Sequence, residues 1–97
     1  MKQHTAFVIC DTSASPNMTY LTHNGKIWTP NLEEAAIWFN KSDVQLYTEK
    51  FITNIFHRQI EAINREGISK FTSIKYNTAY KNYFRLKQTV IPVEVSV

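Results

Sequence analysis

The residues best suited to molecular recognition lie in one segment near the C-terminus, where cationic and aromatic side chains interleave. The segment contains Lys70, Lys75, Lys81, Arg85 and Lys87 together with Phe71, Tyr76, Tyr80, Tyr83 and Phe84. Cations offset phosphate charge and aromatic faces stack on unpaired bases, so this mixture favours binding of RNA or single-stranded nucleic acid. It fits an acidic protein surface equally well, because tyrosine is an amphipathic anchor that is common at protein interfaces.

We therefore predict a binding surface in the last third of the chain. Its members are Lys75, Tyr76, Tyr80, Lys81, Tyr83, Arg85 and Lys87. The alternative is that the rings complete the hydrophobic core and the lysines only keep the outside hydrated. Residues 1–67 carry six Lys/Arg against seven Asp/Glu, whereas residues 68–97 carry five against one. The net charge of +3 thus belongs to the last third of the chain.

Groups that could catalyse a reaction are few and are spread along the sequence. His4, His23 and His57 lie far apart, and none belongs to an HExxH, CxxC or Cys/His spacing. Cys10 could act as a nucleophile if a histidine approached it, but its apolar strand-like surroundings favour a buried thiol. We therefore predict no catalytic residue, no metal site and a protein that is not an enzyme. A small enzyme that uses Cys10 or a histidine is the less favoured interpretation.

Nucleotide chemistry has no motif in this sequence either. Gly25 and Gly67 are the only glycines, so no glycine-rich phosphate loop is present. Glu33 and Glu34 are adjacent and would project about 100° apart on a helix, which does not suit an acid/base pair. The sequence predicts no cofactor.

Length and composition indicate one globular domain over residues 1–97. The 97 residues are 43% hydrophobic and 13% aromatic, without a long apolar run, so neither a disordered chain nor a membrane span is expected. The segment Met1–Thr5 lacks the apolar core of a secretory signal, and the single Cys10 suits a reducing compartment. We expect a cytoplasmic protein.

The first forty residues predict short strands and one short helix. We expect a strand over His4–Asp11, and a hairpin of Met18–His23 and Lys26–Thr29 around the Asn24-Gly25 turn, in which both residues would take positive φ angles. We also expect a short helix over Leu32–Phe39. Thr29 is placed as the N-cap of this helix. Pro30 follows Thr29 at the first helical position, where a missing N–H loses nothing.

A long amphipathic helix is predicted in the middle of the chain. Ser42-Asp43-Val44-Gln45 fits a capping box at its start, and Gly67 is placed to end it. Its apolar residues recur at three- and four-residue spacing: Val44, Tyr47, Phe51, Ile52, Ile55, Phe56, Ile60 and Ile63. A stripe this wide is typical of a helix that lies across a sheet, and the alternative is an exposed partner groove or dimer face.

The last thirty residues predict strand, helix and strand in turn. Phe71–Tyr76 favours a strand, and residues 77–88 fit a short helix or a second strand, of which we choose the helix. In residues 89–97, β-branched side chains alternate with others, which predicts a strand. Pro92 has no N–H to donate, so either this strand lies at a sheet edge or the Pro92 position faces outward. The predicted fold is α+β, an antiparallel sheet of three to four strands with one long and one or two short helices packed on one face.

Part of this pattern resembles small accessory proteins of bacteriophages and mobile elements. The residues that carry the resemblance are Tyr20-Leu21, Gly25-Lys26, Trp28, Leu32, Ala35, Phe39 and the closing run Val90-Ile91-Pro92-Val93-Glu94-Val95. They are structural positions, so no functional residue follows from them. The resemblance implies a protein that binds and inhibits host machinery, as the anti-CRISPR class does.

Two functions therefore follow as hypotheses. The first is a non-enzymatic binding protein that docks on a host protein or nucleoprotein complex and modulates or inhibits it. The second is direct binding of RNA or single-stranded nucleic acid through the basic aromatic C-terminal third. A homodimer through the long helix is a further hypothesis, and a membrane partner is not expected.

Overall fold

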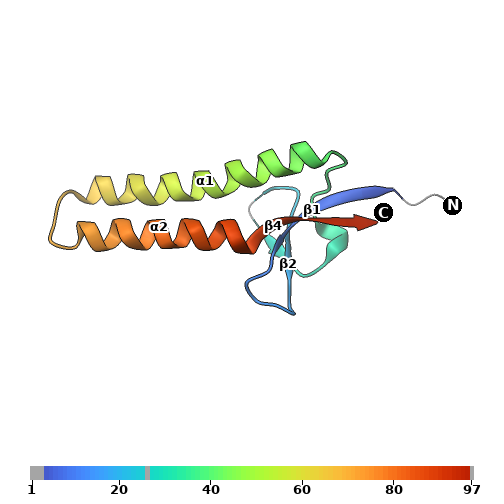
Figure 1. The fold of residues 1–97 in the computed structure, drawn as a ribbon, viewed down its shortest axis with the longest axis horizontal. Helices are drawn as coiled ribbons and strands as arrows, with labels where there is room; N and C mark the ends of the chain where they lie inside the picture. The colour runs from blue at the N-terminus through green and yellow to red at the C-terminus, as the bar shows by residue number, and fades with distance from the viewer. Residues whose placement is uncertain (1–3, 26, 97) are drawn as a thin grey trace.

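The computed structural model describes residues 4–25 and 27–96, which form an antiparallel sheet and a pair of helices that projects from it (Figure 1). The elements in chain order are β1 (Thr5–Asp11), β2 (Thr19–Leu21), β3 (Trp28–Thr29), a 3₁₀ turn η1 (Leu32–Glu34), α1 (Lys41–Glu66), α2 (Thr72–Thr89) and β4 (Val90–Ser96). The principal extents of 62 × 26 × 20 Å reflect the projecting helices. The predicted α+β class with a four-stranded antiparallel sheet is confirmed.

The sheet has the strand order β3-β2-β1-β4, so the strands from the two ends of the chain are neighbours, with β1 inside the sheet and β4 at its edge. β1 pairs with β4 along its whole length, from Thr5 opposite Ser96 to Asp11 opposite Val90. β4 is an edge strand, which is one of the two arrangements predicted from Pro92; this proline stands opposite Ile9. This pairing holds the C-terminal end of α2 against the strand that begins the fold.

The turn between β2 and β3 is wider than predicted. Among the residues of this turn that the structure describes, Gly25 alone has a positive φ, of +70°, and the N–H of Thr22 donates to the carbonyl of Ile27 at 3.0 Å across the turn. Asn24 does not take the positive φ that a two-residue turn requires, so that expectation is wrong. The predicted second strand starts later, at Trp28, and Lys26 lies outside the described residues.

The predicted helix over Leu32–Phe39 is wrong beyond its first turn. The Thr29 hydroxyl accepts the N–H of Asn31 at 3.1 Å and donates to Glu34 at 3.1 Å, which stabilises η1. The N–H of Ala36 then donates to the carbonyl of Leu21 at 2.9 Å. Trp38 exchanges two backbone hydrogen bonds with Phe7. These strand partners satisfy the backbone in extended form and override the local helix signal.

α1 begins one residue before the predicted capping box. Asn40 is its N-cap, and the Asn40 side chain accepts the N–H groups of Ser42 at 2.8 Å and Asp43 at 3.3 Å. Asparagine is as effective a cap as serine, and it stands first in the chain. The predicted end is confirmed, because Gly67 has a φ of +80° and follows the last helical residue.

α2 is longer than the predicted short helix and includes the segment predicted as a strand. Residues 77–88 are helical, as chosen, but Phe71–Tyr76 is wrong as a strand because the helix starts at Thr72. The N–H of Lys75 already donates to the carbonyl of Phe71 at 3.0 Å. Ring contacts with α1 support this helix, a tertiary partner that alternation in the sequence cannot show.

The hydrophobic core lies where the sheet meets the N-terminal half of α1. Its buried residues are Ile9, Leu21, Val44, Ile52 and Val90, with Phe7, Trp28, Trp38, Phe51, Tyr83 and Leu86 packed around them. The long helix covers the sheet only over this half. Beyond it, α1 pairs with α2 away from the sheet, whereas the sequence predicted a helix lying across it (Figure 1). Residues 41–89 are called the helical arm below.

Candidate binding surface on the helical arm

One side of the helical arm carries a row of ring contacts between its two helices. The centroid of Phe56 on α1 lies 5.1 Å from Tyr80 and 4.8 Å from Tyr83 on α2, and Tyr83 lies 5.7 Å from Phe84. Spacings of three and four residues put Tyr80, Tyr83 and Phe84 along one side of α2. Tyr80 is 50% exposed and Phe84 is 58% exposed. We call Phe56, Tyr80, Tyr83 and Phe84 the aromatic row.

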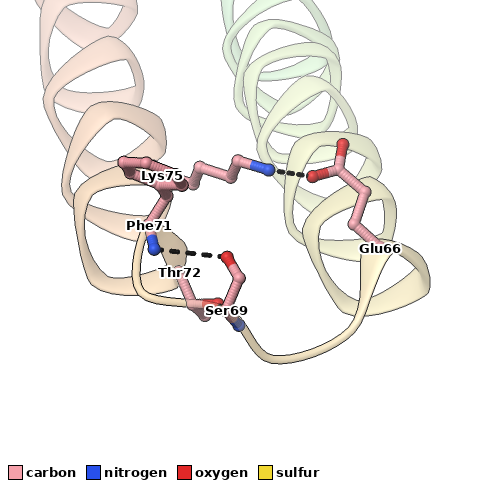
Figure 2. Close-up of polar contacts among 5 residues, drawn as sticks. All are labelled: Glu66, Ser69, Phe71, Thr72 and Lys75. Atoms are coloured by element: carbon pink, nitrogen blue, oxygen red, sulfur yellow. Dashed lines mark hydrogen bonds and ion pairs between the residues drawn. The ribbon is translucent and has the colours of Figure 1, made fainter.

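The distal end of the arm is fastened by polar contacts between the helices. The Tyr76 hydroxyl donates to the Asn64 side-chain oxygen, and Lys75 forms an ion pair with Glu66. Figure 2 shows the Lys75 side chain reaching across the space between α2 and α1 to this carboxylate. Both members of the ion pair remain partly exposed, at 43% and 55%. Solvent therefore screens the attraction, and the pair contributes little stability.

The loop at the tip of the arm is ordered by its own side chains. The N–H of Ser69 donates to the Thr72 hydroxyl at 2.9 Å, and the N–H of Phe71 donates to the Ser69 hydroxyl at 3.2 Å, as Figure 2 shows for the latter. These bonds satisfy backbone donors at the start of α2. Ile68 is 99% exposed here, beside the exposed ring of Phe71. The tip therefore presents apolar side chains to solvent.

The helical phase of α2 brings together four of the seven predicted binding residues. Tyr76, Tyr80, Tyr83 and Lys87 follow one another at spacings of four, three and four, which places them along one face. The Lys87 ammonium lies 5.2 Å from the centre of the Tyr83 ring. This is a cation–π distance, so the charge is held beside the aromatic row.

The other three predicted residues lie elsewhere on α2. Lys75 lines the opposite side of the arm, and Arg85 donates to Asn82 on that side at 2.5 Å. Lys81 is exposed and stands four residues from Arg85 and three from Phe84, so these two cations share an outer face that borders the aromatic row at Phe84. The seven residues thus form an aromatic face with one cation and a separate, more cationic outer face.

The opposite side of the arm contains a shallow groove of about 440 Å³ between the helices. Its lining residues are Gln59, Ala62, Ile63, Ile74, Lys75, Thr78, Ala79 and Asn82. Small side chains such as Ala62 and Ala79 leave this space, whereas rings fill the corresponding position on the aromatic side. The two sides of the arm therefore differ in shape as well as in chemistry.

Three members of this surface were missed from the sequence. Phe56 and Phe84 complete the aromatic row, and Ile68 projects at the tip. Phe56 was assigned to the core stripe of the long helix, and Phe84 was left out of the predicted set. The signal that could have found both is the three- and four-residue spacing of rings on two antiparallel helices.

The residues with catalytic potential do not converge in the structure. Cys10 is fully buried in β1, and its pKa is raised by burial and, to a lesser extent, by the negative charge of Asp11. His4, His23 and His57 are exposed and lie on a strand end, a turn and a helix. In residues 4–25 and 27–96, no group of three or more His, Cys, Asp or Glu side chains could hold a metal ion.

No helix among the described residues is long and apolar enough to cross a membrane. Comparisons with protein-family models, with curated proteins and with solved structures find no match to this chain. The geometry of the helical arm and its chemistry are therefore the basis for a proposal of function.

Proposed function

We propose that this is a non-enzymatic binding protein whose helical arm docks on an anionic surface of a host protein or nucleoprotein complex. The observation that carries the proposal is the aromatic row, which is flanked by cations and in which Tyr80 and Phe84 are half-exposed. It lies on an arm that projects from the sheet (Figure 1). The resemblance to phage accessory proteins adds the expectation that docking modulates or inhibits its target.

The energetic argument starts from the exposed rings. Tyr80 and Phe84 leave about half of their surface in water, and apolar area removed from water contributes roughly 25 cal/mol per Å². A partner that covers both rings would gain stabilisation that the free protein lacks. Exposed aromatic residues beside polar ones are typical binding anchors.

The charge argument favours an acidic partner. α2 contains Lys75, Lys81, Arg85 and Lys87 and no carboxylate. Glu66 offsets the charge of Lys75, which leaves three cations on this helix without a carboxylate within ion-pair distance among the described residues. An acidic surface would be attracted to this helix and oriented by it.

The test is affinity capture from host lysate with and without nuclease. We expect the variant Tyr80→Ala/Phe84→Ala to lose the captured partner and Lys81→Glu to weaken its capture. Lys41→Glu is the matched control, because it makes the same charge change at the start of α1, beside the sheet. Equal capture by wild type and by both arm variants would contradict the proposal.

A second candidate function is direct binding of RNA or single-stranded nucleic acid by the same surface. The cation–π pair of Lys87 and Tyr83 supports it, because phosphate and base could be contacted together. This candidate predicts that nuclease treatment removes the captured material and that affinity falls steeply with salt. The hypothesis of a homodimer is tested separately, by sedimentation of the purified chain.

A further inference from the structure

A second concave surface lies at the base of the helical arm, between α1 and the turn that joins β2 to β3. Its volume is about 610 Å³, which is within the range of roughly 300–1,000 Å³ typical of small-molecule sites. Its lining residues are Asn24, Gly25, Trp28, Tyr47, Lys50, Phe51, Asn54, Ile55 and Arg58. We call this surface the basal groove. It contains none of the residues of the aromatic row.

The rings of the basal groove are held in place by their neighbours. Trp28 meets Phe51 edge to face, with centroids 5.9 Å apart at 79°, and Tyr47 lies 5.1 Å from the ring of Trp38. The Tyr47 hydroxyl approaches Gly25 so closely that a Cβ at this glycine would lie 2.6 Å from it. An aromatic wall that is fixed before binding loses little conformational freedom when a flat ligand stacks on it.

The charges of the basal groove are all positive. Lys50 and Arg58 are both exposed, and no carboxylate lines the groove. Neither cation has an ion-pair or hydrogen-bond partner among residues 4–25 and 27–96. One ridge of α1 carries Lys50, Asn54 and Arg58 at four-residue spacing, so an amide lies between two cations. Successive residues of this ridge are about 6 Å apart along the helix axis.

We propose that the basal groove binds a nucleotide unit, either free or as an unpaired residue of a nucleic acid strand. The base stacks on the exposed aromatic surface of Tyr47 and Trp28, and the phosphate lies between Lys50 and Arg58. The Asn54 amide can donate to and accept from a base edge. The proposal is independent of docking by the aromatic row, since the groove belongs to α1 and to the β2–β3 turn.

The experiment follows the fluorescence of Trp28. The chain has two tryptophans, so Trp38→Phe leaves Trp28 as the only reporter in the groove. The probes are adenosine monophosphate, a single-stranded decanucleotide and poly-glutamate, each titrated at low and moderate salt. We expect quenching by the decanucleotide, and quenching by the mononucleotide as well if the groove accepts a free nucleotide. Quenching by poly-glutamate alone would overturn the proposal in favour of an acidic protein ligand.

The decisive variants remove two charges at each of two places. Lys50→Gln/Arg58→Gln should weaken binding by about tenfold or more and reduce the salt slope for the decanucleotide by about 0.7, because one phosphate contact is lost. Lys41→Gln/Arg65→Gln is the matched control at the two ends of α1, outside the groove lining, and should leave the quenching unchanged. The proposal is wrong if no nucleotide probe quenches Trp28, or if the control variant weakens binding as much as Lys50→Gln/Arg58→Gln does.

Discussion

The sheet end and the distal half of the helical arm are built in opposite ways. The sheet end buries Ile9, Leu21 and Val44 completely. Among the described residues, the only buried side chains of the arm beyond Ile52 are Ile63 and Ala79. The arm instead leaves rings and an isoleucine in solvent, at 58% for Phe84 and 99% for Ile68.

Under the proposed function, this difference places stability in the sheet end and partner binding in the arm. A core contributes stability by burying apolar area, and a surface that must bind a partner has to leave such area exposed. The distal arm keeps its shape through ring contacts, the Tyr76 to Asn64 hydrogen bond and the Lys75 to Glu66 ion pair. We therefore expect substitutions at the sheet end to change stability and substitutions on the arm to change binding.

The largest expected contrast concerns thiol reactivity. Cys10 is fully buried and its pKa is raised by burial, so modification requires the sheet to open. For a domain with about 5 kcal/mol of stability, labelling by a thiol reagent should be roughly five-thousandfold slower than in denaturant. The variant Cys10→Ser/Ser69→Cys, with its thiol at the exposed tip, should label at the unprotected rate. Rapid labelling of native Cys10 would show that the sheet end is not the stable part.

The next contrast compares two isoleucines. Ile9→Ala creates a cavity in the core and should lower the free energy of unfolding by about 2–5 kcal/mol. Ile68→Ala removes the same atoms from a 99% exposed side chain and should change the free energy of unfolding by less than about 0.5 kcal/mol. Urea denaturation followed by circular dichroism measures both. Similar losses for the two variants would contradict the division between the two regions.

A smaller contrast concerns two glycines with positive φ. Gly25→Ala strains the backbone at φ +70° and places a methyl group 2.6 Å from the Tyr47 hydroxyl, so a loss of about 1–3 kcal/mol is expected. Gly67 has a φ of +80°, and a Cβ at this position would meet nothing within 4 Å. A loss of about 1 kcal/mol of stability is therefore expected for Gly67→Ala. Thermal denaturation of the two variants compares them, and a larger loss at Gly67 would show that the close approach of Tyr47 is unimportant.

The smallest expected effect is at the ion pair of the tip. Glu66→Gln removes the partner of Lys75, and because both side chains are partly exposed the loss should be at most about 1 kcal/mol. Glu61→Gln, also exposed on α1, is the control and should have no effect. Denaturation at low and high salt measures the difference, which should shrink as salt is added. A loss of several kcal/mol would mean that the tip is essential for the stability of the arm.

Elements with a chemical marker at their ends were predictable. Gly67 ends α1 in a conformation, φ +80° and ψ 177°, that is essentially confined to glycine, and Pro92, which lacks an N–H, lies on an edge strand. Two segments were mispredicted, Leu32–Phe39 and Phe71–Tyr76. The first takes backbone partners from β1 and β2, and the second takes side-chain partners from α1, all distant in the chain. Local propensity is weak enough for such partners to override it.

The candidate surface was predictable in composition but not in arrangement. The sequence showed that cations and tyrosines gather in the last third. Because Phe71–Tyr76 was assigned to a strand, the sequence could not show that Tyr76 shares a helix face with Tyr80 and Lys87. It also could not show that Lys81 and Arg85 lie on a different face of the same helix. The basal groove was not predicted at all, because it joins a turn to a helix more than twenty residues later.

By itself, the amino-acid sequence determined the class of the fold, the presence of the first strand, the long helix with its terminating glycine, and the location of the basic and aromatic residues. These follow from periodicity, backbone preference and charge, which act between neighbours in the chain. Only the tertiary structure decided that the two helices extend beyond the sheet as one arm, and which rings and cations share a face. That depends on contacts between residues far apart in sequence, whose free energy no local pattern contains.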